Sequence, residues 1–122
     1  MVRIFALVFL LAKAAHADPA IIEAVKGEQT GSTWRFDVTI SHPDTGWDHY
    51  ADGWRVLSMD GTVLGTRVLH HPHVNEQPFT RSLSGVDIPA DATQIQIEAR
   101  DSSAGWSDEL VTIDLNEPTY TR

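Results

Sequence analysis

The stretch WRFDVTI, residues 34–40, decides the fold class because its apolar and polar residues alternate without interruption. Successive side chains of an extended chain point to opposite faces, so Trp34, Phe36, Val38 and Ile40 would share one face. The polar residues between them would share the other face. The pattern predicts a β-strand that is buried on one side only.

The same alternation recurs in QIQIEAR, residues 94–100, and again over residues 111–115. Two further apolar runs flank Asp60-Gly61, a pair that favours a type I′ hairpin turn because both central residues of that turn need a positive φ. Turn-forming residues separate the remaining runs. We therefore expect an all-β domain of about seven strands, at about residues 20–27, 33–41, 53–59, 62–69, 78–84, 93–100 and 109–115.

The number and spacing of these strands resemble the immunoglobulin and fibronectin type III class of β-sandwich. The resemblance implies a single Ig-like antiparallel sandwich, although the cysteine pair of true immunoglobulin domains is absent. The strings GWDHYADGW, residues 46–54, and HHPHVNEQPFTRSLSG, residues 70–85, also resemble small exported proteins of proteobacteria that have no assigned activity. This second resemblance implies export and offers no mechanism.

The first residues have the pattern of a cleavable secretory signal. Arg3 is followed by an apolar run over residues 4–12, which is too short to span a bilayer, and then by the small-residue motif Ala15-His16-Ala17. We predict a signal peptide over residues 1–17, a sandwich domain over 18–116 and a flexible C-terminal tail over 117–122. The expected location is periplasmic or secreted.

The composition limits the possible partners. The chain has 9 Lys and Arg against 17 Asp and Glu, and loss of Arg3 and Lys13 with the signal would make the domain still more acidic. Binding to nucleic acid or to an anionic membrane is not expected, since both need clustered basic residues. The chain contains no cysteine, so any metal site would have to use histidine and carboxylate ligands.

All five histidines outside the predicted signal fall in loops that should lie at one end of the sandwich. If successive strands reverse direction, residues 41–52, 70–77 and 101–108 lie at the same end. The first two of these segments carry the histidines, which are His42, His49, His70, His71 and His73. The sequence therefore predicts a surface of imidazoles and carboxylates at this end.

A divalent transition metal, copper(II) or zinc, is the first candidate ligand for that surface. In a strand-like His71-Pro72-His73 both imidazoles point to one face, so His71 and His73 are the natural pair, with His70 beside them. His42 or His49 would join from the neighbouring loop. The alternative is a solvated loop without any ligand. Histidines among so many carboxylates should have raised pKa values, so metal binding should weaken as pH falls.

Aromatic residues at the same end offer a second function, recognition of a protein or a glycan. Trp47, Tyr50 and Trp106, with Asp48 and Asp101, would form the partner-binding residues. The alternative is that both tryptophans cover the open end of the sandwich. We do not expect an enzyme, because no nucleophile elbow, HExxH motif or phosphate-binding loop occurs; a histidine general base would need a concave pocket.

Overall fold

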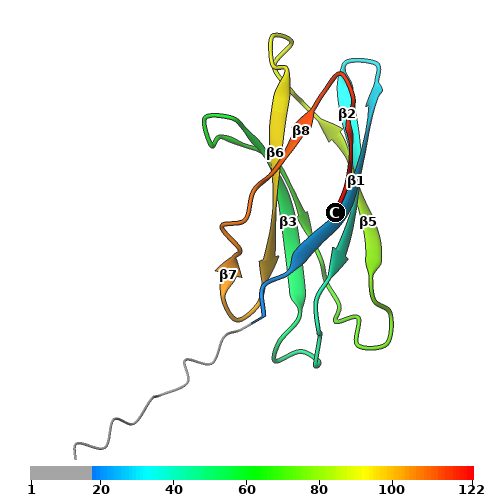
Figure 1. Ribbon diagram of the computed structural model, residues 1–122, viewed down its shortest axis with the longest axis vertical. Coiled ribbons are helices and arrows are strands. Elements are labelled where there is room, and N and C mark those ends of the chain that lie inside the picture. The colour runs from blue at the N-terminus through cyan, green and yellow to red at the C-terminus, as the bar shows by residue number, and fades with distance from the viewer. Residues whose placement is uncertain (1–17) are drawn as a thin grey trace, which may run out of the picture.

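The structure is a computed structural model that describes residues 18–122; the predicted signal peptide lies outside the described residues. Two antiparallel sheets form the domain (Figure 1). None of the described residues belongs to a helix of the length and hydropathy that a membrane crossing needs. The described strands are β1 (Ile21–Thr30), β2 (Thr33–Ser41), β3 (Ala51–Ser58), β4 (Val63–Val68), β5 (Phe79–Val86), β6 (Gln94–Asp101), β7 (Gly105–Trp106), β8 (Val111–Asp114) and β9 (Thr119–Thr121).

One sheet has the strand order β5-β2-β1-β9. The other has the order β4-β3-β6-β7, and β8 pairs with β6 in the same sheet. The all-β sandwich-like fold expected from the sequence is thus confirmed. The strands β7 and β9 are additional to the expected set of about seven, and both are only two or three residues long.

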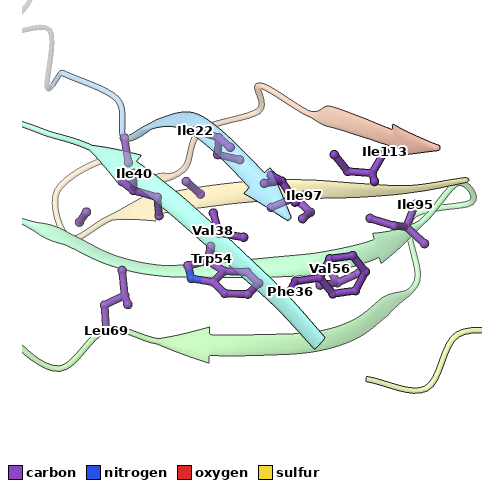
Figure 2. Close-up of a cluster of buried hydrophobic side chains, with 14 of the residues drawn as sticks. Ile22, Phe36, Val38, Ile40, Trp54, Val56, Leu69, Ile95, Ile97 and Ile113 are labelled. Atoms are coloured by element: carbon purple, nitrogen blue, oxygen red, sulfur yellow. The ribbon is translucent and has the colours of Figure 1, made fainter. Parts of the chain in front are cut away.

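Strand β2 has the predicted alternation and supplies much of the core. Phe36, Val38 and Ile40 are buried, whereas Arg35 and Thr39 lie on the outer face and bond to Ser82 and Thr80 of β5. Figure 2 shows these apolar side chains packed against residues of the second sheet, including Trp54 from β3 and Ile95 and Ile97 from β6. Trp34 is only partly buried and stacks on Phe36.

The C-terminal residues, for which the sequence predicts a flexible tail over 117–122, are paired in the structure. Strand β9 aligns Tyr120 with Val25 of β1, and Gly27 N–H donates to the carbonyl of Pro118 over 2.7 Å. Residues 119–121 alone are too few for a clear period-2 pattern. The unpaired edge of β1 supplies the hydrogen-bond partners that make this short strand possible.

Replacing Tyr120 with alanine is expected to lower the free energy of unfolding by about 1–3 kcal/mol, because its ring packs against the core. Replacing the exposed neighbour Thr121 with alanine should cost less than about 0.5 kcal/mol. Urea denaturation of both variants measures the difference. Equal, negligible losses would show that the segment is a free tail after all.

Candidate metal centre

Three loops meet at one end of the sandwich, at the bottom of Figure 1. Ser102 N–H, after β6, donates to the carbonyl of Tyr50 over 2.9 Å, which joins the 102–104 turn to the 42–50 loop. His73 N–H donates to Asp44 Oδ2 over 2.7 Å, which joins the 69–78 loop to the same segment. The sequence prediction that these segments share an end is therefore confirmed.

Asp44 is the hydrogen-bond acceptor around which the loops are arranged. Its Oδ1 accepts from Ala51 N–H at 3.0 Å, and its Oδ2 accepts from His73 N–H. Each oxygen of Asp44 therefore already has a backbone amide as its partner. The 2.5 Å contact between His42 Nδ1 and Asp44 Oδ1 is assigned as a donation from Nδ1–H, because a carboxylate is an acceptor. Both side chains are fully buried.

His42, His49 and Asp101 bring their ligand atoms together within 4.8 Å of one another. The two Nε2 atoms are 3.2 Å apart, and His49 Nε2 lies 3.5 Å from Asp101 Oδ1. Two ligands of a tetrahedral zinc ion at 2.0–2.1 Å would lie about 3.3 Å apart. The two measured separations therefore suit one small divalent cation.

Asp101 is held rigidly, and one of its two carboxylate oxygens can still accept a hydrogen bond or bind a cation. Its Oδ1 accepts from Ser103 N–H and Ala104 N–H, at 2.8 and 2.7 Å, so the turn after β6 fixes the carboxylate. Its Oδ2 is buried and has no hydrogen-bond partner among the described residues. A buried carboxylate oxygen without a partner carries a large desolvation cost, which a bound cation would offset.

His73 lies outside this group and has a different role. Its ring stacks on Phe79, with centroids 4.0 Å apart, and Arg81 donates to its Nε2 over 2.8 Å. The lone pair that a metal would need is therefore occupied. His70 and His71 are exposed, and the segment between β4 and β5 is not a strand, so the geometry assumed for His71 and His73 does not apply.

Burial and the neighbouring Arg81 guanidinium lower the pKa of His73 from its ordinary value of 6.5. The sequence prediction that carboxylates raise the histidine pKa values is thus wrong for His73, because desolvation and Arg81 outweigh Glu76 and Asp44.

Because the folded pKa lies below the unfolded one, the unfolded state binds the proton more readily near pH 6. The contribution of His73 to stability is full above about pH 6.5 and is lost as pH falls through its folded pKa. We expect the unfolding free energy of the wild type to fall more than that of His73→Phe between pH 7.5 and 5.5. Urea denaturation at the two pH values measures this, and equal falls would contradict it.

The aromatic residues expected to bind a partner are divided between two places. Trp47 is 67% exposed and contacts the rings of Tyr50 and His71 at centroid distances of 5.7 and 6.4 Å. Trp106, on β7, lies beneath the guanidinium of Arg55, which is 3.8 Å from the centre of its ring. Trp47 therefore does not cover the end of the sandwich, and it does not form one platform with Trp106.

Of the two acids assigned to the same partner surface, Asp48 is exposed and Asp101 is buried. Asp101 therefore belongs with the metal group and not with a partner surface. The sequence places Asp101 at the correct end, and the period-2 pattern of β6 also indicates its inward side chain, because Asp101 follows the buried residues Ile95, Ile97 and Ala99 in the same alternation.

A hollow of about 390 Å³ lies beside the site and is lined by residues from the start of the domain and from the two histidine-bearing loops. His42 is among the lining residues, yet its side chain is fully buried. The hollow therefore does not expose an imidazole nitrogen of His42 to a bound molecule, as a general base would require.

No protein-family model matches the chain, and no solved structure matches it significantly. A protein of Halomicrobium mukohataei that is named "Putative lipoprotein" is 32% identical to it over 94 residues. The match covers 77% of this chain and 46% of the relative, so the chain spans about half the length of that protein.

Proposed function

We propose that this protein is an exported, non-enzymatic domain that binds one divalent transition metal ion through His42 Nε2, His49 Nε2 and the carboxylate of Asp101. The observation that carries the proposal is the 3.2 Å approach of two imidazole nitrogens beside a buried, incompletely bonded carboxylate. Asp44 orients His42 through Nδ1, which is the usual second partner of a metal-bound histidine.

The donor set favours zinc or copper(II). Imidazole suits both ions, and a carboxylate commonly completes their sites. Copper(I) prefers thiolate or thioether ligands, and the chain has no cysteine. With a divalent cation bound, the charges of Asp44 and Asp101 would balance those of the metal ion.

Export is supported by two independent features. The first 17 residues have the pattern of a secretory signal, and the relative is named a lipoprotein, a class of the cell envelope. The present sequence contains no cysteine that could carry a lipid. We therefore favour a periplasmic or secreted location for the domain.

Isothermal titration of the chain with zinc and with copper(II) tests the proposed function. We expect saturable binding of one ion per chain, with an affinity that falls about 100-fold or more in His49→Ala because a ligand is lost. His70→Ala is the matched control, since it removes an exposed histidine from the same end. Wild-type binding no tighter than buffer background, or equal losses in both variants, would contradict the proposal.

Recognition of a glycan is a second candidate, favoured by the 67% exposure of Trp47. An exposed indole beside Tyr50 offers a flat apolar face on which a sugar ring stacks. Titration with soluble hexaoses of glucose and of N-acetylglucosamine should then change the tryptophan fluorescence of the wild type. Trp47→Ala should lose the change and Trp106→Phe should keep it; no change in the wild type would remove this candidate.

A further inference from the structure

The backbone carbonyl of Asp18 lies at the metal centre as well. Its oxygen is 2.9 Å from His42 Nε2, the atom that we assign as a ligand. Asp18 is three residues before β1, and the next residue but one, Ala20, is buried in the core. The carbonyl is therefore held near the histidine by the packing of the chain that follows it.

This contact is favourable only when a proton or a metal ion lies between the two atoms. His42 donates from Nδ1 to Asp44, so in a neutral imidazole Nε2 carries a lone pair and no hydrogen. A carbonyl oxygen also offers only lone pairs. Two such acceptors facing each other over 2.9 Å repel, unless a proton on Nε2 or a metal ion lies between them.

The separation also suits shared coordination. Two ligands about 2.05 Å from one metal ion are about 2.9 Å apart when they subtend a right angle at it. His42 Nε2 is 3.2 Å from His49 Nε2 and 2.9 Å from Asp18 O, so both neighbours lie within the range expected for adjacent ligands of one ion.

We propose that the backbone carbonyl oxygen of Asp18 is a fourth ligand of the metal ion, which completes a set of two nitrogen and two oxygen donors. The inference rests on the proposed function and adds a consequence to it. Metal binding would fasten the segment before β1 to the 42–50 loop and the turn after β6, and so link the start of the domain to its two sheets.

The test uses the full chain, made by cell-free synthesis with aspartate labelled with ¹³C at the backbone carbonyl and loaded with copper(II). Electron–nuclear double resonance then reports labelled carbonyl carbons close to the copper. The side-chain carboxylate of Asp101 carries no label, so it does not contribute. We expect one strongly coupled ¹³C nucleus.

The matched control is Asp18→Asn, which keeps the backbone carbonyl and removes the label. Its copper affinity should stay within about twofold of the wild type, while the strong ¹³C coupling disappears. Bound copper without strong ¹³C coupling in the wild type, or coupling that persists in Asp18→Asn, would overturn the assignment of the Asp18 carbonyl as a ligand. Either result would leave the three-ligand metal centre in place. Absence of copper binding would overturn the metal centre itself.

Discussion

Replacing Asp44 with alanine is expected to lower the free energy of unfolding by about 2–4 kcal/mol, because its buried carboxylate accepts three hydrogen bonds. Its loss would leave His42 Nδ1–H and the amides of Ala51 and His73 without their acceptor. The same variant should bind zinc about 10–100-fold more weakly, since His42 is no longer oriented. Urea denaturation and calorimetric titration measure the two effects.

The control for that variant is Asp48→Ala, which removes the same charge from the same loop at an exposed position. It should change the unfolding free energy by less than about 0.5 kcal/mol. If Asp44→Ala and Asp48→Ala behaved alike, the loop end would be held together by something other than the Asp44 carboxylate.

Replacing Trp54 with alanine is expected to cost about 3–5 kcal/mol of unfolding free energy, because its ring is fully buried between the sheets (Figure 2). The cost comes from lost apolar contacts and from the cavity that remains. Trp47→Ala is the matched control, since that ring is mostly exposed, and it should cost less than about 0.5 kcal/mol. Similar unfolding midpoints for the two variants would contradict the assignment of the core.

The fold was predictable because its main strands carry a period-2 pattern that burial on one face imposes. WRFDVTI and QIQIEAR lie in β2 and β6, and Asp60-Gly61 lies at the turn between β3 and β4. The type I′ geometry expected for that turn is wrong, because Gly61 has a positive φ and Asp60 does not. The short strands β7 and β9 were not predictable in this way. Residues 105–106 and 119–121 become strands because β6 and β1 offer them backbone partners.

The candidate site was predictable in position but not in composition. Alternating strand directions correctly put all five histidines at one end, and His42 and His49 remain in the metal group. His71 and His73 were the favoured pair because a strand geometry was assumed for them. Sequence could not show that Arg81 occupies the Nε2 of His73. The inward side chain of Asp101 was indicated by the alternation Ile95, Ile97, Ala99, Asp101, but the metal prediction did not use it.

In the proposed site His42 and His49, and not the His70–His73 segment, hold the metal ion. Long-range ¹H–¹⁵N correlation spectra of the imidazole rings, recorded with and without one equivalent of zinc, test it most directly. We expect the Nε2 signals of His42 and His49 to move to the metal-bound range while those of His70, His71 and His73 stay in place. Zinc-dependent shifts of His71 and His73, with His42 and His49 unchanged, would contradict this assignment of the ligands.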